Sequence, residues 1–320
     1  PLDRLNIDTV RRLSTKIARA EPIAVGQQSL SFSSSPVATD TEWVLPIDAD
    51  LDLRYDLVTL SADGRLQLLQ QNDSGWKQTA ELSLDVKPSG LFAADLFMVD
   101  SSDSDRIKRV EKIETGGVST RDYSLKVRHN TLPGLILFGD FGIRLVQIDL
   151  REQTSADGRL AVVEKKTGLE DLPPIHAVTT GDLEGDGDLD LIVAPKSGSI
   201  RLFINRGNRT FFEAPVNTNT VDSDDPVADM AIGDLERDID LDVVTIHRSG
   251  RVAMLENLLH LQFRFKDLAD VPRLPVSDDD PSLSVSVEDV DSNVGWDIVA
   301  TSSEQSLVAF GNSSDVGVWT

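Results

Sequence analysis

The residues of this chain that are best suited to chemistry lie between Gly181 and Ala194, where the sequence reads GDLEGDGDLDLIVA. Crowded carboxylates repel one another unless a cation neutralises them. Ca²⁺ accepts several oxygen ligands in flexible geometry, and the two glycines allow a turn that brings alternate side chains onto one centre. The stretch therefore predicts a calcium loop. Its acidic residues occupy alternate positions: Asp182, Glu184, Asp186, Asp188 and Asp190.

The residues after this loop predict a strand. An EF-hand begins in a similar way, but it needs a Glu at its twelfth position and a helix afterwards. The twelfth position here is Val193, and LDLIVA is typical of a buried strand. Two interpretations remain, a short cation loop that leads into a sheet and an acidic, Gly-rich turn without metal. We favour the cation loop.

The same nine-residue frame returns at Asp48, Asp234 and Asp289. In every copy a mainly apolar run follows the ninth position, a turn comes eight residues after it, and an amide comes seven residues later. The amides are Gln71, Asn205, Asn257 and Asn312. We predict weaker cation sites in these three copies, with the following side chains: Asp48, Asp50, Asp52 and Asp56; Asp234, Glu236, Asp238 and Asp242; Asp289, Asp291, Asn293 and Asp297.

A fifth copy is interrupted. Counting back from the turn at Gly142 places Gly134 at the ninth position, and the strand LFAAD supplies Asp95 as the first position. The polar, charged segment between them predicts an insertion at about residues 96–133. Without it, the copies recur roughly every 50 residues, which is the spacing of propeller blades.

These repeats predict an all-β fold, a β-propeller of four-stranded blades with five visible repeats and a short N-terminal helix. Residues 1–40 form the helix and a connecting or closing segment, and residues 41–320 form the propeller. Gly, Pro, Asn and Asp punctuate four short strands in each unit. Radial repetition covers the faces that a single sheet leaves open. The blades are expected to start near residues 41, 88, 174, 226 and 281.

The pattern G-D-x-[DE]-G-D-G-D-x-D-[LIV], followed by a turn Gly, an apolar strand and Asn, resembles the FG-GAP/VCBS repeat of integrin-type β-propellers. The resemblance covers about residues 41–320 and is most specific at Asp182–Asp190. It implies Ca²⁺ binding by the side chains of Asp182, Glu184, Asp186 and Asp190, together with the carbonyl of Asp188.

The other copies depart from this pattern because both loop glycines are replaced. Arg237 and Ile239 replace them in the Asp234 copy, Leu51 and Leu53 in the Asp48 copy, and Ser292 and Val294 in the Asp289 copy. Non-Gly residues are strained where φ must be positive. We therefore expect one well-occupied Ca²⁺ at Asp182–Asp190 and partial or no occupancy elsewhere.

The composition of the chain argues against several classes of function and of site. The chain has 320 residues and a formal net charge of −23, so a nucleic-acid partner is not expected, because such partners need a positive surface. There is no cysteine, which excludes disulfides and thiolate metal sites. No apolar stretch is long enough to span a membrane. We expect an extracytoplasmic location: periplasmic, secreted or at the cell surface.

Residues 1–20 have an amphipathic helical pattern with Asp8 as a candidate N-cap. The favoured interpretation is a helix docked on the acidic propeller. The alternatives are a helix that binds a partner or a membrane surface and the tail of an upstream helical domain. Residues 21–40 are candidates for a strand that closes the ring.

A second group of acidic residues precedes the blades and predicts an acidic rim on the face away from the cation loops. It consists of Asp222, Asp224 and Asp225; Asp278, Asp279 and Asp280; and Glu170 and Asp171 beside His176. Solvated loops are the favoured interpretation over a ligand site, and His176 is expected to be structural.

The sequence contains no G-x-S-x-G, H-E-x-x-H or P-loop motif. The favoured function is a non-catalytic propeller that binds a protein or glycan partner, with Ca²⁺ stiffening at least one blade loop. The alternative is a propeller enzyme, a lyase or hydrolase that acts on a polysaccharide. A fold alone does not decide between these classes.

Overall fold

The computed structural model describes most of the chain after residue 39. The described residues are 40–49, 54–72, 75–98, 131–148, 160–163, 166–207, 210–215, 225–258, 261–268, 271–277, 282–293, 295–311 and 319. The predicted N-terminal helix and nearly all of the predicted insertion lie outside these residues, so both stay predictions. No helix among the described residues is long and apolar enough to span a membrane.

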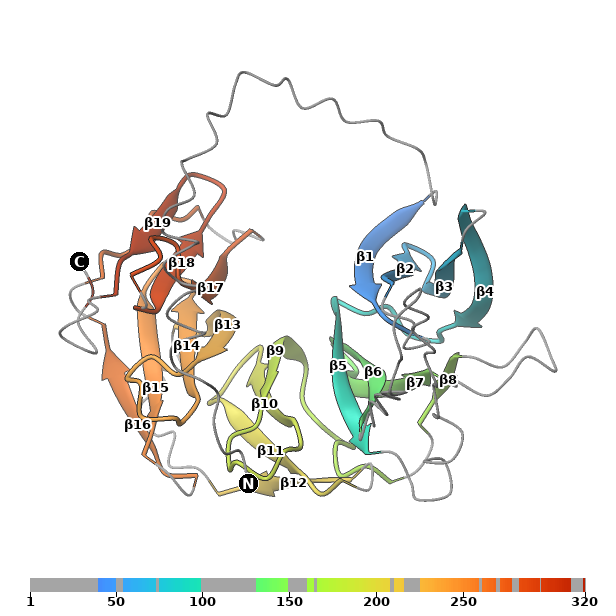
Figure 1. Cartoon of the computed structure of the whole chain (residues 1–320), viewed down its shortest axis with the longest axis horizontal. Helices are drawn as coiled ribbons and strands as arrows, with labels where there is room; N and C mark the ends of the chain where they lie inside the picture. Colours follow the sequence, from blue (N-terminus) through green and yellow to red (C-terminus); the bar gives the residue numbers. More distant parts are fainter. Residues whose placement is uncertain are drawn as a thin grey trace, which may run out of the picture. The chain divides into compact units, whose positions relative to one another are not determined.

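The described residues form strands that assemble into five antiparallel sheets (Figure 1). The first sheet has the order β1-β2-β3-β4 and the second has the order β5-β6-β7-β8. Their strands are β1 (Thr41–Ile47), β2 (Asp56–Ser61), β3 (Arg65–Asn72), β4 (Gly75–Ser83), β5 (Gly90–Met98), β6 (Thr131–Gly139), β7 (Gly142–Ile148) and β8 (Leu160–Val162).

The third and fourth sheets repeat this order, and the fifth sheet has three strands. Their strands are β9 (Ile175–Gly181), β10 (Asp190–Pro195), β11 (Arg201–Asn205), β12 (Phe211–Ala214), β13 (Val227–Gly233), β14 (Asp242–His247), β15 (Val252–Asn257), β16 (Phe263–Asp267), β17 (Ser284–Glu288), β18 (Asp297–Thr301) and β19 (Ser306–Ala309). The fold is therefore all-β, and its sheets have the strand order of propeller blades.

Strand register follows the nine-residue frame in every sheet. The ninth loop position pairs with the residue before the first position, as in Asp190 with Gly181 and Asp242 with Gly233. In the second sheet Gly134 pairs with Ala94, the residue before Asp95, so the interrupted copy has the same register. β5 and β6 continue to pair beyond this point, through Phe97 with Leu132 and Met98 with Thr131, after a register shift between Ala94 and Phe97.

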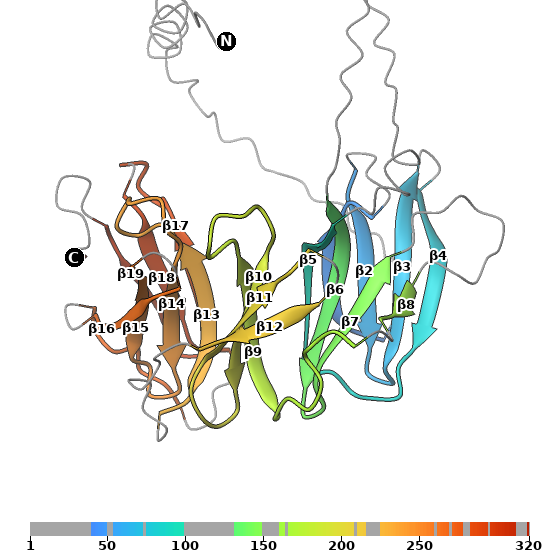
Figure 2. The same cartoon turned by 90° about the horizontal axis from the view of Figure 1, so that it is seen from below.

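Successive sheets pack through their first strands. β1 contacts β5, β5 contacts β9, β9 contacts β13, and β13 contacts β17. Strands in the middle of a sheet are covered on both faces, and β10 and β14 are buried along their whole length. The strands β4 and β16 lie at the outer edges of their sheets (Figure 2). They are more exposed and carry Lys and Arg side chains, which discourage edge-to-edge pairing.

Candidate metal centre and the residues around it

The frame loops connect the first and second strands of their sheets. In the Asp182 loop, Asp182 accepts three backbone N–H groups: Oδ1 accepts those of Gly185 (2.8 Å) and Asp186 (3.1 Å), and Oδ2 accepts that of Gly187 (3.0 Å). Asp186 Oδ1 accepts the N–H of Asp188 (2.9 Å). These bonds fold the loop around its own first carboxylate.

The Asp at the ninth loop position is buried and accepts two backbone N–H groups from separate parts of its sheet, and we call this arrangement the clamp. Asp190 is fully buried, its Oδ2 accepts the N–H of Leu183 (2.9 Å), and its Oδ1 accepts the N–H of Asn205 at the end of β11 (2.9 Å). One side chain therefore ties the loop to the third strand of the same sheet. Burial raises the pKa of Asp190 to about 7, although the two N–H donors oppose this shift.

The clamp recurs in three further sheets. Asp242 accepts the N–H groups of Leu235 and Asn257, and Asp56 accepts those of Ala49 and Gln71. In the fifth sheet, Asp297 accepts the N–H groups of Val290 and Gly311. Gly311 takes this role in the fifth sheet because the β18–β19 hairpin is one residue shorter than β10–β11.

The loop conformation does not depend on the two glycines. Gly185 and Gly187 have φ of 76° and 93°, and Arg237 and Ile239 adopt 56° and 84° at the same positions of the Asp234 loop. Asp234 also accepts the N–H groups of Asp238 (3.0 Å) and Ile239 (3.2 Å), as Asp182 does in its own loop. The glycines remove strain, and the side-chain hydrogen bonds of the first-position Asp maintain the turn without them.

The carboxylates of the Asp182 loop remain crowded. Burial, followed by the charge of Asp186, raises the pKa of Glu184. Burial, followed by the charges of Asp186 and Asp182, raises the pKa of Asp188. Because the crowded oxygens disfavour negative charge, the donor set suits a hard divalent cation.

Convergence of carboxylate oxygens is closest in a different loop. Among the described residues, one oxygen each of Asp289, Asp291 and Asp297 lie within 4.8 Å of one another. Asn293 belongs to this loop and donates through Nδ2 to Asp291 (2.8 Å) and to the carbonyl of Gly311 (3.1 Å). This loop lacks the glycines, so sequence alone ranked it below Asp182–Asp190.

In the Asp234 loop, a lysine side chain of the protein contacts one of the predicted metal ligands. Lys266 on β16 donates to Glu236 Oε1 (3.0 Å), the third-position side chain that the sequence proposed as a metal ligand. The buried side chain of Glu256 accepts a bidentate pair of hydrogen bonds from Arg264. In the Asp48 loop, Asp48 and Asp56 are described, whereas Asp50 and Asp52 lie outside the described residues.

Part of the predicted acidic rim is engaged in structural contacts. Asp225 accepts the N–H of Ser249 (3.0 Å) and its hydroxyl (2.7 Å), and it lies 3.4 Å from Arg251 Nε. Glu170 accepts the N–H of Gly168 (2.9 Å) within its own turn. Asp222, Asp224 and Asp278–Asp280 lie outside the described residues, so the rim as a ligand site stays a prediction.

The sequence singled out His176, but His247 is the more deeply buried of the two histidines among the described residues. His247 is fully buried at the end of β14, and its Nδ1 lies 2.7 Å from the carbonyl oxygen of Asp225. Its Nε2 lies 3.1 Å from Thr245 Oγ1. Burial lowers the pKa of His247, so it is a neutral link between β14 and the segment before β13. The sequence shows that His247 begins the HRSG turn. It does not show the contact with Asp225, because the two residues are 22 positions apart in the chain.

His176 lies near charged residues of two sheets. It is half-buried on β9, and burial is the main cause that lowers its pKa. Arg248 and Lys196 lower the pKa of His176 further, and Asp229 opposes them. Lys196 itself donates to Asp140 (2.7 Å) of the second sheet. The imidazole is thus a neutral base beside cationic groups.

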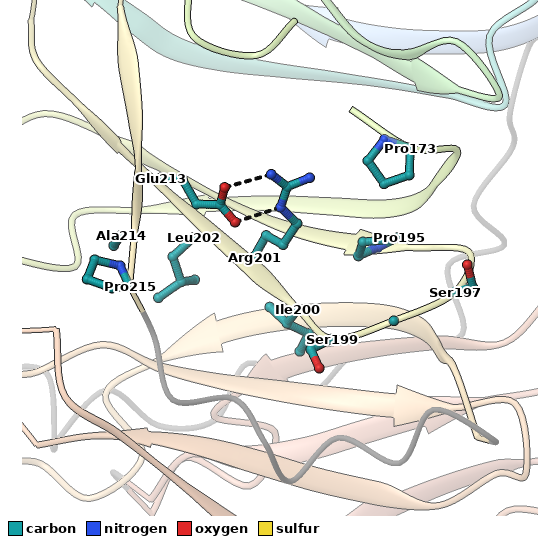
Figure 3. Close-up of a pocket in the computed structure, with 11 residues that line it drawn as sticks. Pro173, Pro195, Ser197, Ser199, Ile200, Arg201, Leu202, Glu213, Ala214 and Pro215 are labelled. Atoms are coloured by element: carbon teal, nitrogen blue, oxygen red, sulfur yellow. Dashed lines mark hydrogen bonds and ion pairs between the residues drawn. The ribbon is translucent and has the colours of Figure 1, made fainter. Parts of the chain in front are cut away.

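A cleft of about 540 Å³ lies at one end of the third sheet (Figure 3). Arg201 and Glu213 are joined at its border by two hydrogen bonds of 2.7 Å, so each neutralises the other. Its remaining lining comes mainly from prolines, serines and aliphatic residues: Pro173, Pro195, Ser197, Gly198, Ser199, Ile200, Leu202, Ala214 and Pro215. None of the predicted metal ligands lines this cleft.

Comparison with known proteins supports the resemblance that the repeat frame indicated. Residues 182–245 match the family model of the FG-GAP-like repeat. Residues 182–245 therefore carry an FG-GAP-like repeat. The match begins at the first position of the Asp182 loop and ends within β14, so it includes the Asp234 loop as well. No curated protein matches the chain.

Two solved structures are similar at a low level. The first is the crystal structure of BBS1N in complex with ARL6DN, soaked with lead, with 13% identity, a TM-score of 0.49, and coverage of 88% of this chain and 68% of that chain. The second is the same complex soaked with mercury, with 15% identity, a TM-score of 0.40, and coverage of 83% of this chain and 78% of that chain.

Proposed function

We propose that this FG-GAP-like repeat chain is a non-catalytic β-propeller scaffold that recognises a protein or glycan partner, with Ca²⁺ stiffening the Asp182–Asp190 loop. The observation that carries the proposal is the repeated clamp by the ninth-position Asp. It fixes four acidic loops at equivalent places in their sheets. Loops held rigidly on a packed scaffold are suited to binding, because little conformational entropy is lost when the partner docks.

The calcium part of the proposal rests on the donor set of the Asp182 loop. Asp182, Glu184, Asp186 and Asp190 supply carboxylate oxygens, and hard cations prefer such oxygen ligands. Burial, followed by the charge of Asp186, raises the pKa of Glu184, and a cation would offset both effects. In the Asp234 loop, Lys266 already offsets part of the charge of Glu236, which favours lower occupancy there.

Thermal unfolding with saturating Ca²⁺ and with a chelator tests the metal. A cation that binds only the folded chain raises its stability by mass action. The wild type is expected to melt at a higher temperature with Ca²⁺, and Asp186→Ala is expected to lose most of that difference. Glu304→Ala is the matched control, because it removes one exposed carboxylate from the β18–β19 turn without touching a frame loop. Identical melting of the wild type in both conditions would exclude the calcium site.

Protein and glycan arrays probed with the Ca²⁺-loaded chain test the binding role. We expect the chain to bind at least one ligand on these arrays. Replacing acidic side chains of the frame loops by the corresponding amides should weaken that binding. Glu304→Gln again serves as the control. Broad arrays without a ligand, in which the chain is shown to be folded, would contradict the scaffold function.

The alternative function is a lyase or hydrolase that acts on a polysaccharide, and the environment of His176 favours it as the second candidate. A neutral imidazole beside Arg248 and Lys196 could accept a proton while the cations hold an acidic sugar. Turnover on a panel of polysaccharides, lost in His176→Ala and retained in His247→Gln, would establish this activity. If no polysaccharide of the panel is turned over, the enzyme function is rejected in favour of the scaffold function.

A further inference from the structure

The Asp234 loop has the same ligand types and the same turn as the Asp182 loop. Both loops have Asp at the first, fifth and ninth positions and Glu at the third. Arg237 and Ile239 adopt positive φ, as the two glycines of the other loop do, and the first-position Asp accepts the fifth-position N–H in both loops. Because backbone conformation and ligand types are shared, a difference in cation binding has to come from the side chains around each loop.

The third-position Glu makes different contacts in the two loops. Glu184 hydrogen-bonds with Asp186, so its carboxyl group stays within its own loop. Glu236 instead reaches the third and fourth strands of its sheet. Lys266 Nζ on β16 donates to Glu236 Oε1 (3.0 Å), and the carboxyl groups of Glu236 and Glu256 share a hydrogen bond. The third ligand of this loop is therefore already engaged by groups of the protein.

Three polar side chains of the fourth sheet replace three apolar side chains of the third. The amides Asn205 and Asn257 fix the alignment, because the ninth-position Asp of each sheet accepts their N–H groups. Counting along the paired strands from these amides gives the equivalent pairs Ile204 and Glu256, Phe212 and Arg264, and Ala214 and Lys266. The third sheet therefore presents apolar groups where the fourth presents one carboxylate and two cations.

The contact between Lys266 and Glu236 belongs to a larger network. A single exposed ion pair contributes little to stability. Here the side chains of Glu236 and Lys266 are only 21% and 36% exposed, and that of Glu256 is 4% exposed. Glu256 accepts a bidentate pair of hydrogen bonds from Arg264. Since a buried carboxylate is costly unless it is paired, two carboxyl groups and two cations stabilise one another without a metal.

We propose that the ammonium group of Lys266 is a built-in counter-ion of the Asp234 loop, which replaces Ca²⁺ and makes this loop independent of calcium. The ammonium repels a dication, and Ca²⁺ would have to break the Lys266–Glu236 bond to gain its third-position ligand. Because Lys266 is part of β16, the counter-ion is present at every calcium concentration. The inference rests on the proposed function, in which the Asp182 loop binds Ca²⁺, and it assigns opposite calcium dependence to the loops of two neighbouring sheets.

Counting the Ca²⁺ ions bound per chain tests the inference. Equilibrium dialysis with free Ca²⁺ up to roughly 5 mM covers the dissociation constants of about 0.1–1 mM that extracellular modules show. Lys266→Met removes the ammonium and keeps an apolar stem, and it should bind one more Ca²⁺ per chain than the wild type. Adding Asp238→Ala, which removes a ligand of the same loop, should abolish this gain. Lys266→Gln keeps a donor for Glu236 without the charge and should show the same gain, so it replaces the methionine variant if that variant does not fold.

Two control variants exclude other causes of a gain. Lys87→Met removes the same charge from an exposed ion pair with Glu42, which belongs to no frame loop, and should bind no additional Ca²⁺. Arg237→Gly combined with Ile239→Gly restores both loop glycines while Lys266 is kept, and it should bind no additional Ca²⁺ either. A gain in this glycine variant would overturn the inference, because it would show that the missing glycines prevent binding.

Melting temperatures provide a second readout. With a chelator, Lys266→Met should melt below the wild type, because two carboxyl groups lose a counter-ion, and Ca²⁺ should raise the melting temperature of the variant more than that of the wild type. The inference is overturned if neither Lys266 variant gains Ca²⁺, or if Asp238→Ala alone removes a Ca²⁺ from the wild type. Failure of the proposed calcium function is a separate result, because it appears as a wild-type count that Asp186→Ala does not lower.

Discussion

At the scale of single residues, the carboxylates of the repeat frame divide into two roles. The ninth-position side chains Asp56, Asp190, Asp242 and Asp297 are buried and accept two backbone N–H groups each. Among the described residues, the third- and fifth-position side chains are more exposed. A single sequence motif therefore combines a structural clamp with a candidate cation site, and substitutions at the two kinds of position should have different effects.

Asp242→Ala is expected to destabilise the chain by about 2–5 kcal/mol, because the N–H groups of Leu235 and Asn257 lose their buried acceptor. Asp242→Asn keeps one acceptor oxygen and should lose less. Urea unfolding measures both effects. Asp238→Ala, in the exposed part of the same loop, is the control and should cost less than about 1 kcal/mol. Equal losses for Asp238→Ala and Asp242→Ala would contradict the clamp role.

His247 predicts a loss of stability in acid. Burial lowers its pKa in the folded chain, with Arg251 adding to this and Asp225 and Asp267 opposing it. The unfolded chain therefore binds the proton more readily. This contribution to stability is present above the unfolded pKa of about 6.5 and is lost as the pH falls through the lower folded pKa.

Melting temperatures between about pH 8 and pH 5 measure this effect. His247→Gln keeps a donor for Asp225 and an acceptor for Thr245. Because burial raises the pKa of Asp190 and Asp242 to about 7 in both proteins, these carboxyls add stability as the pH falls, and only the difference between the two profiles reports His247. The wild type should lose more melting temperature, or gain less, than His247→Gln over that range, and equal changes in both proteins would contradict the role of His247.

At the scale of elements, hairpins with the same frame are packed differently at their turns. Gly198 and Gly250 both have positive φ, at 100° and 75°. A Cβ on Gly198 would meet no atom within 4 Å, whereas a Cβ on Gly250 would lie 1.9 Å from the carbonyl oxygen of Leu274. The β14–β15 turn is therefore fixed by a neighbouring segment, and the β10–β11 turn is open.

Gly198→Ala and Gly250→Ala form a matched pair. Gly198→Ala should cost about 1–2 kcal/mol, which is the strain of a left-handed backbone with a side chain. Gly250→Ala carries the same strain together with the overlap at Leu274, and more than about 4 kcal/mol is expected. Chemical denaturation of the two variants measures the difference. Similar losses would show that the Leu274 segment moves away without cost.

At the scale of the whole molecule, acidic charge is distributed over repeated sheets whose contacts are apolar. The net charge of −23 favours the expanded, unfolded chain through self-repulsion, whereas the clusters between sheets favour the folded one. The molecule should therefore respond to ionic strength independently of any bound cation.

Raising NaCl from about 10 mM to about 200 mM should increase the melting temperature, because salt screens this repulsion. Adding Ca²⁺ at the higher, matched ionic strength should give a further increase only if a frame loop binds it, and loss of that increase in Asp186→Ala would assign it to the Asp182 loop. Differential scanning calorimetry separates the two effects. A melting temperature that falls with NaCl would show that stabilising ion pairs such as Arg201–Glu213 outweigh the repulsion.

The sequence by itself determined the repeat frame, the strand order within a sheet and the register of the interrupted copy. These properties depend on hydrogen bonds between residues close in the chain and on apolar alternation, both of which the sequence displays directly. The pairing of Gly134 with Ala94 is an example, because the turn at Gly142 was enough to locate it.

Only the tertiary structure decided which side chains work together across larger separations. Asn257 reaches Leu183 across 74 residues, Lys266 reaches Glu236 from another strand, and His247 reaches the segment before β13. Such contacts depend on how sheets and loops pack, and no local pattern encodes that packing.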